Sequence, residues 1–275
     1  MMPTRLQSLA AVAAALTLAA CAPRRPPPDL SLDPAALLAQ VEAAGAAVTR
    51  VQGEARLRLD APGARGTVPV FVAVERPDRL HVEALDFFGN PAATLVAAGG
   101  RLAIYDARAR TFYVGSATGA NVARLVPLPL PPERLVAILC GTPVLEGGPD
   151  AAEPGSGEVT LTLREGPRTA TLRVGPRAAL LRASFRGGAP AVPDHEVAYG
   201  AFVDLERVRF PIEVAVTSRD PAVRLELAWK EPEVGGKSLD AGLFRMDPPA
   251  GAKVVDLDAT ELPPASLPLP LQPAP

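Results

Sequence analysis

The stretch EARLRLDAPGARGTVPVFVAVERPDRLHVEALD, residues 54–86, decides the fold of this chain. Apolar residues alternate with other residues along it, and turn sequences interrupt the alternation at a Pro-Gly pair (62–63) and at RPDR (76–79). A period of two is typical of strands that bury one face, and Pro, Gly and Asp favour tight turns. The stretch therefore predicts three strands that pair antiparallel through short turns.

The same pattern extends through most of the chain. Three further strands are expected between residues 92 and 116, and six more from residue 158 onward, nearly all joined by short turns. We predict a mainly β fold with a single curved antiparallel sheet, an open half-barrel of about eleven strands in up-and-down order. Residues 146–157, EGGPDAAEPGSG, are expected to form a polar loop because Gly and Pro dominate them.

Three helices are expected beside this sheet. Asp33 and Pro34 suit the N-cap and first position of a helix that runs to about Arg50. Two short helices, at about 118–126 and 131–140, flank a proline-rich hinge at 127–132. Both short helices are strongly apolar on one side, so we expect them to lie on the sheet as a lid over a hydrophobic cavity.

The N-terminus has the features of an export signal. Arg5 precedes an uncharged run from Leu6 to Ala20. This run is shorter than the roughly 20 residues that a transmembrane helix needs. Leu18-Ala19-Ala20-Cys21 resembles the lipobox of bacterial lipoproteins, in which the cysteine is acylated. Ala22, rather than Asp, after this cysteine points to the outer membrane. The alternative is an ordinary signal peptide that contains a cysteine.

The segments divide the chain as follows. A lipoprotein signal peptide spans 1–20, a Pro-rich tether 21–32, and one folded domain 33–256. A Pro-rich tail without regular structure spans 257–275. Proline-rich linkers are extended and semi-rigid.

The composition argues against several classes of function. A formal net charge of -2 without basic clusters does not favour nucleic acid as a partner. Cys140 lies in an apolar helical pattern and is expected to be a small buried hydrophobe rather than a nucleophile. His81 and His195 are expected on the surface of their strands. Since we find no metal-ligand spacing and no catalytic motif, we expect no enzyme, no metal and no cofactor.

Phe87 and Phe88 stand immediately before Gly89-Asn90-Pro91, a turn sequence. The two rings are therefore expected at the tip of a hairpin. Exposed apolar residues at a turn are a liability unless they serve a function. The alternative is that both rings fold back under the lid as part of the core.

Four stretches together resemble the LolA/LolB lipoprotein localisation family. They are RPDRLHVEALDFFGNPAATL (76–95), ANVARLVPLPLPPERLVAILCGTP (120–143), EVAYGAFVDLERVRFPIEVAV (196–216) and VRLELAWKE (223–231). With an acylated N-terminus, the membrane-anchored LolB branch is the closer match, although LFRMDPPAGAKVVDLD (243–258) is closer to the soluble carrier branch.

The resemblance implies a function. In that family an eleven-stranded half-barrel with a helical lid encloses a cavity for lipoprotein acyl chains. The anchored branch accepts a lipoprotein from a LolA-like periplasmic carrier and inserts it into the outer membrane. A protruding apolar loop residue important for insertion falls on Phe88, with Phe87 beside it. The implied partners are incoming lipoproteins, that carrier and, through acylated Cys21, the outer-membrane bilayer; we expect a monomer at its periplasmic face.

Apolar residues on the inner face of the sheet and on the lid are the candidates for the acyl-chain cavity. They are Val70, Val72, Val74, Leu80, Val82, Ile104, Phe112, Leu125, Leu135, Ile138, Ile212, Val214, Leu225, Leu227 and Trp229. The same residues would serve equally as an ordinary core. A second interpretation is therefore an envelope lipoprotein that uses this fold as a docking scaffold for a multiprotein complex.

Overall fold

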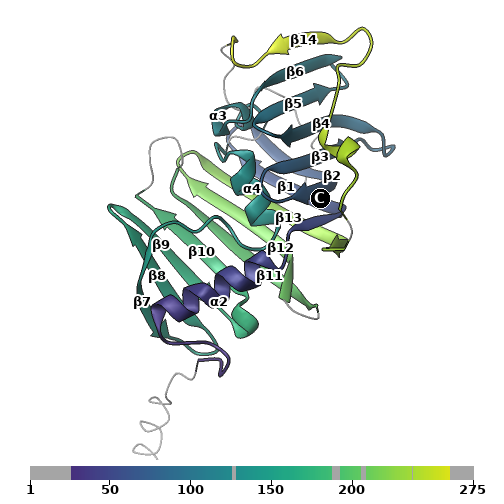
Figure 1. The fold of residues 1–275 in the computed structure, drawn as a ribbon. Coiled ribbons are helices and arrows are strands. Elements are labelled where there is room, and N and C mark those ends of the chain that lie inside the picture. The colour runs from purple at the N-terminus through teal and green to yellow at the C-terminus, as the bar shows by residue number, and fades with distance from the viewer. Residues whose placement is uncertain (1–25, 126–127, 188–192, 206–208, 237, 261–275) are drawn as a thin grey trace, which may run out of the picture.

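The structure is a computed structural model that describes residues 26–125, 128–187, 193–205, 209–236 and 238–260. Within these residues fourteen strands form one open, curved sheet in the order β14-β6-β5-β4-β3-β2-β1-β13-β12-β11-β10-β9-β8-β7 (Figure 1). The predicted single curved sheet with a helical lid is confirmed, with more strands than the eleven or twelve expected.

Two meanders make up the sheet. The first is β1 (Arg50–Ala61), β2 (Ala64–Glu75), β3 (Arg79–Leu85), β4 (Pro91–Ala98), β5 (Arg101–Asp106) and β6 (Thr111–Ser116). The second is β7 (Gly148–Pro154), β8 (Val159–Glu165), β9 (Arg168–Val174), β10 (Leu180–Arg186), β11 (His195–Asp204), β12 (Arg209–Arg219) and β13 (Ala222–Val234). Antiparallel pairing of β1 with β13, from Val51 opposite Val234 to Asp60 opposite Arg224, joins the two halves.

The two additional strands lie at the edges of the sheet. β7 falls within the segment predicted as a polar loop, and that prediction is wrong. Its prolines, Pro149 and Pro154, are tolerated because an edge strand needs hydrogen bonds on one side only. At the opposite edge β14 (Lys253–Asp256) pairs parallel with β6 rather than antiparallel.

The helices lie on the concave face (Figure 1). α2 (Pro34–Ala46) begins at Asp33, whose side chain accepts the backbone N–H of Ala36, and buries Leu37 and Val41 against the β7 half. Each such side chain contributes about 1.5–3 kcal/mol on burial. α3 (Gly119–Val122) and α4 (Pro132–Leu139) are the predicted lid helices, the first much shorter than expected.

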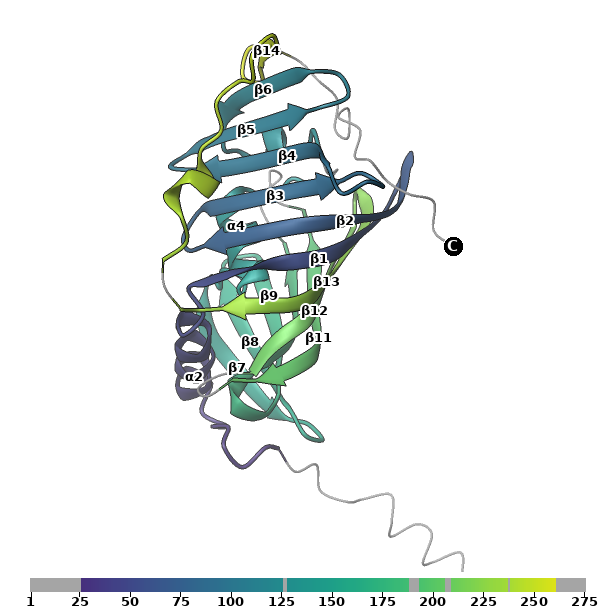
Figure 2. The same ribbon diagram turned by 90° about the vertical axis from the view of Figure 1, so that its right-hand side faces the viewer.

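The back of the β1–β6 half is covered by the chain that follows β13. It contains the short helix η3 (Ala241–Phe244), seen against the back of β3 and β4 in Figure 2. The His81 Nδ1 lies 2.7 Å from the Leu243 carbonyl oxygen, and this ring is only 8% exposed. His195 is 6% exposed and stacks on Phe185 at 4.8 Å between ring centroids. The prediction of surface histidines is therefore wrong, because η3 contacts the His81 ring and Phe185 on the neighbouring strand covers the His195 ring.

The end of the described chain is bound to β6 and α3. The Asp258 carboxylate accepts hydrogen bonds from the Ser116 amide, the Ser116 hydroxyl and the Asn121 side-chain amide, each at 2.8 Å. Leu257 is buried beside it. These two residues, assigned to the tail from the sequence, therefore pack into the fold, and they hold the first turn of the lid. We name the contacts of Asp258 the Asp258 clasp.

Acid should open the Asp258 clasp. The hydrogen bonds from Ser116 and Asn121 hold the pKa of Asp258 below its ordinary value of 3.8. A lowered carboxylate pKa stabilises the fold above the unfolded pKa, and this stability is lost as pH falls through the folded pKa. We expect amide-exchange protection of Ser116 and Asn121 to fall selectively below about pH 4. Asp258→Asn should weaken their protection already at pH 6, and hydrogen-exchange NMR measures both effects.

The matched control is Asp240→Asn, which removes the carboxylate that caps η3 through Gly242. It should leave protection of Ser116 and Asn121 unchanged. Protection that is independent of pH and equal in both variants would contradict a structural role for the clasp.

Candidate functional site

An apolar cavity of about 130 Å³ lies on the concave face beneath the lid. It sits where the two halves of the sheet meet, between β2–β4 on one side and β12–β13 on the other. All seventeen side chains around it are aliphatic, and the lid contributes residues from α3, from α4 and from the segment between them. Among the described residues the cavity has no polar side chain in its wall, so an apolar group is the ligand that it suits.

Strand register explains why these side chains converge. Residues that face each other across an antiparallel pair share one face of the sheet. Val72 lies opposite Val82, which in turn lies opposite Leu95. Leu57 lies opposite Leu227, which lies opposite Val214. The first row lies on β2, β3 and β4, and the second crosses from β1 to β13 and β12, so the two rows border the cavity from both halves of the sheet together with residues of α4.

Ten of the fifteen residues proposed from the sequence line this cavity. They are Val70, Val72, Leu80, Val82, Leu125, Leu135, Ile138, Val214, Leu225 and Leu227. Seven lining residues were not proposed: Leu57, Ala84, Leu95, Val122, Leu128, Leu139 and Val216. Leu57, Leu95 and Val216 follow the period of two and were therefore detectable. Leu128 lies in the proline-rich hinge, where no periodic pattern exists.

The remaining five proposed residues do not line the cavity. Val74, Ile104 and Trp229 are buried in the packed core of the β1–β6 half, and Ile212 packs against that core. Phe112 lies opposite Tyr105, whereas Ile104 on the concave face lies opposite Tyr113. Phe112 therefore points to the other face of the sheet, and its assignment to the cavity is wrong.

Polar contacts anchor the C-terminal end of the lid helix α4. The Arg76 guanidinium donates to the carbonyl oxygens of Val48 at 3.1 Å, Thr142 at 3.0 Å and Ala137 at 3.4 Å. The last carbonyls of a helix lack partners within the helix, and a cation there is also favoured by the helix dipole. No sequence pattern identified Arg76, because its partners are backbone carbonyls rather than a carboxylate.

Tyr199 anchors the same end of α4 from the other half of the sheet. Its hydroxyl, which is buried, donates to the Ile138 carbonyl at 3.1 Å. At the opposite end of α4, Pro131 provides no side-chain cap. The C-terminal end of the lid helix is thus fixed by both halves of the sheet. Its N-terminal end is held by packing of the buried Pro132 and by the ion pair of Arg134 with Glu146.

Cys140 follows α4 and is buried, as predicted. Burial raises the pKa of its thiol to about 11, and the nearby Arg76 offsets only part of this effect. The thiolate, which is the nucleophilic form, is therefore disfavoured at neutral pH. In the part of the chain that the structure describes, no group of three His, Cys, Asp or Glu residues has the arrangement of a metal site.

The turn between β3 and β4 presents two phenylalanines to solvent. Phe87 and Phe88 are 84% and 83% exposed, and their rings contact only each other edge-to-face at 5.5 Å among the aromatic rings of the described residues. Asp86 fixes the turn by accepting the amides of Phe88 at 2.8 Å and Asn90 at 2.9 Å. These hydrogen bonds, led by that from Asn90, lower the pKa of Asp86. The alternative that the rings fold under the lid is excluded. We call residues 86–90 the Phe tip.

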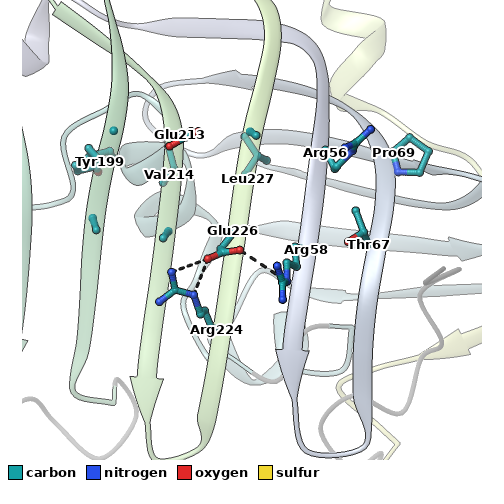
Figure 3. A pocket seen from close by; sticks show the side chains of 14 residues that line it. Arg56, Arg58, Thr67, Pro69, Tyr199, Glu213, Val214, Arg224, Glu226 and Leu227 are labelled. Atoms are coloured by element: carbon teal, nitrogen blue, oxygen red, sulfur yellow. Dashed lines mark hydrogen bonds and ion pairs between the residues drawn. The ribbon is translucent and has the colours of Figure 1, made fainter. Parts of the chain in front are cut away.

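A second hollow, of about 930 Å³, lies on the back of the sheet across β1, β2, β11, β12 and β13. Figure 3 shows Arg58 and Arg224 directed toward Glu226, at 3.9 Å and 2.6 Å between nearest charged atoms. Its walls include the polar side chains of Arg56, Thr67 and Glu213. We name it the back groove. Although it is larger than the cavity, its charged wall does not suit an acyl chain.

Among the described helices none combines the length and apolarity needed to cross a bilayer. No protein-family model and no curated protein matches the sequence. Solved structures do match in shape. A LolA superfamily protein from Nitrosomonas europaea has a TM-score of 0.53 at 13% identity, over 76% of this chain and 97% of its own.

Two further structures match at the same level. A putative outer membrane lipoprotein-sorting protein domain from Vibrio parahaemolyticus has a TM-score of 0.52 at 10% identity, over 75% of this chain and 94% of its own. A DUF1329 family protein from Desulfovibrio piger has a TM-score of 0.51 at 12% identity, over 78% and 98%. These likenesses show the fold, a LolA-like open sheet with a helical lid.

Removal of the Arg76 guanidinium should loosen the lid. Arg76→Gln leaves buried carbonyls without their charged donor, and such hydrogen bonds contribute about 1.5–3 kcal/mol. We expect the free energy of unfolding in urea to fall by about 2 kcal/mol, with faster amide exchange in α4. Arg65→Gln, which removes an exposed ion pair with Asp60, should cost less than about 1 kcal/mol. Equal effects of the two substitutions would contradict an anchoring role for Arg76.

Proposed function

We propose that this chain binds the acyl chains of lipoproteins, or of lipids, in the cavity beneath its lid. In this proposal it is an outer-membrane-anchored lipoprotein of the LolB-like branch that inserts its cargo into the outer membrane, and it is not an enzyme. The observation that carries the proposal is that every described residue in the wall of the cavity is aliphatic. Support comes from the fold shared with LolA superfamily structures.

The volume of the cavity requires the lid to move. At about 130 Å³ it is similar to an engineered cavity of about 150 Å³ that holds benzene. Ligand cavities for larger molecules span about 300–1,000 Å³. The closed structure therefore has room for a short segment of one acyl chain. Each further methylene group that leaves water contributes about 0.8 kcal/mol, which favours opening of the lid.

Delivery to the membrane rests on two features. Cys21, which lies outside the described residues, would carry the lipid anchor, followed by Ala22 as in outer-membrane lipoproteins. The Phe tip would enter the interface of the bilayer, where aromatic side chains are favoured. A LolA-like periplasmic carrier would supply the cargo, and the chain would act as a monomer.

A docking scaffold is the second candidate function. The back groove favours it, because a broad hollow with both arginine and glutamate side chains suits a polar protein surface better than a lipid. In that case the apolar cavity would be only an imperfection of packing. The two candidate functions differ in whether the purified protein contains bound lipid.

Lipid should accompany the purified protein. We would express residues 22–275 without acylation in a bacterial host, extract the protein with organic solvent and identify bound phospholipid or lipopeptide by mass spectrometry. Val82→Phe fills the cavity and should reduce bound lipid strongly, whereas Val254→Phe, at an exposed site on β14, should not. Trp229, the single tryptophan of the sequence, lies in the core beside the cavity and reports binding of an acyl probe by fluorescence. Absence of both lipid and probe binding would refute lipid transport.

Phe88→Glu should abolish insertion of lipoproteins into outer-membrane vesicles. A carboxylate at the tip is expelled from the bilayer, while the exposed position predicts an unchanged fold and unchanged acyl binding. Phe88→Leu keeps an apolar tip and is the matched control. Transfer at the wild-type rate by the glutamate variant would remove the Phe tip from the mechanism.

A further inference from the structure

Three exposed cations lie beside the Phe tip. Arg108 and Arg110 belong to the β5–β6 turn, and Lys253 begins β14. The Ala107 amide bonds to the Ala92 carbonyl at 3.0 Å, which places the β5–β6 turn next to the strand that leaves the Phe tip. The Lys253 amide bonds to the Arg110 carbonyl at 2.9 Å, which joins β14 to the same turn. We name Arg108, Arg110 and Lys253 the cationic corner.

The charges of the cationic corner are not neutralised within the described part of the chain. None of the three side chains forms an ion pair there, and the Arg110 guanidinium only approaches the Ala250 carbonyl, at 3.4 Å. By contrast, Arg65 at the start of β2 is paired with Asp60 at 2.7 Å. The cationic corner therefore presents three positive charges to solvent.

The carboxylates of the same two turns face backbone amides rather than these cations. Asp106 is buried and accepts the amides of Arg108 at 2.9 Å and Ala109 at 3.0 Å. Asp86 accepts the amides of the Phe tip. The cationic corner and the two turns together contain three basic side chains and two carboxylates, so their formal net charge is positive. An apolar tip next to exposed cations complements a surface that is apolar below a layer of negative charge.

The turns that carry these residues lie on one side of the sheet. Figure 2 shows the β1–β2, β3–β4 and β5–β6 turns along its right-hand side. The register places Asp106 opposite Ala93, so the end of β5 lies beside the beginning of β4. A flat membrane can therefore touch the Phe tip and the cationic corner simultaneously.

We propose that the cationic corner binds the phosphate groups of anionic lipids in the bilayer that the Phe tip enters. This inference rests on the proposed membrane contact of the Phe tip and names the lipid charge that favours it. The tip supplies apolar insertion into any bilayer, and Arg108 and Arg110 add attraction to a negative surface. Each basic side chain near such a surface contributes about fivefold in binding.

Vesicle flotation of non-acylated residues 22–275 tests the proposal. The vesicles are phosphatidylcholine alone or a mixture with phosphatidylglycerol. We expect wild-type binding to rise with phosphatidylglycerol and to weaken with salt. Arg108→Gln with Arg110→Gln should lower binding to the anionic vesicles about 25-fold and leave binding to neutral vesicles unchanged.

The matched control removes the same charge elsewhere. Arg56 lies in the back groove. Arg101 begins β5 and therefore lies at the end of this strand that is opposite to the β5–β6 turn. Arg56→Gln with Arg101→Gln should retain the preference for anionic vesicles, and circular dichroism and thermal unfolding confirm that both pairs of substitutions fold. Equal losses in the two double variants would show an effect of total charge and overturn the proposal.

The Phe tip is tested separately in the same assay. Phe88→Glu should reduce binding to both kinds of vesicle. Wild-type binding that depends on Phe88 but not on phosphatidylglycerol would overturn the cationic corner and leave the proposed membrane contact intact. No binding of the wild type to either vesicle would refute the membrane contact itself.

Discussion

The pairing of β1 with β13 is the contact on which the rest of the structure depends. It joins strands that start more than 170 residues apart, at Arg50 and Ala222, and makes one sheet out of two meanders. Without it each half would expose an edge and an apolar face. A bulge between Gln52 and Glu54 interrupts the register, and a side chain at Gly53 would come within 3.2 Å of the Pro232 backbone. Bulges bend a strand, and this one lies at the seam between the two halves.

The same seam determines where space is left inside the molecule. In the β7 half, α2 fills the concave face with Leu37 and Val41. In the β1–β6 half the short lid covers the concave face without filling it, and the cavity remains between the lid and the sheet. Arg76 from the β2–β3 turn and Tyr199 from β11 hold the lid from both sides of the seam. The position of the cavity and the attachment of its lid thus follow from one strand pairing.

Sequence patterns predicted what depends on local periodicity. Alternation placed most strands and ten cavity residues, and proline and glycine marked the ends of α4. Phe112 was assigned to the wrong face of the sheet. The conformation of the β5–β6 turn, where Arg110 has a φ of +50°, determines which residues of β6 point to the concave face, and the sequence pattern does not predict this conformation. β7 was missed because an edge strand tolerates the prolines that normally exclude a strand. The burial of His81 and the role of Arg76 depend on contacts across 162 and up to 66 residues, which no local pattern contains.

The places of the chain start and the Phe tip constrain how the molecule would sit on a membrane. The described chain begins beside α2 in the lower half, whereas β3 and β4 lie in the upper half (Figure 1). Five residue steps separate Cys21 from Pro26, and they span at most about 18 Å. If Cys21 carries the lipid, contact of both ends with one bilayer requires the long axis of the sheet to lie along the surface. Fourteen strands at about 4.8 Å apart would give a footprint about 60 Å long. Such an orientation would keep the strands of both halves at a similar height above the lipid headgroups.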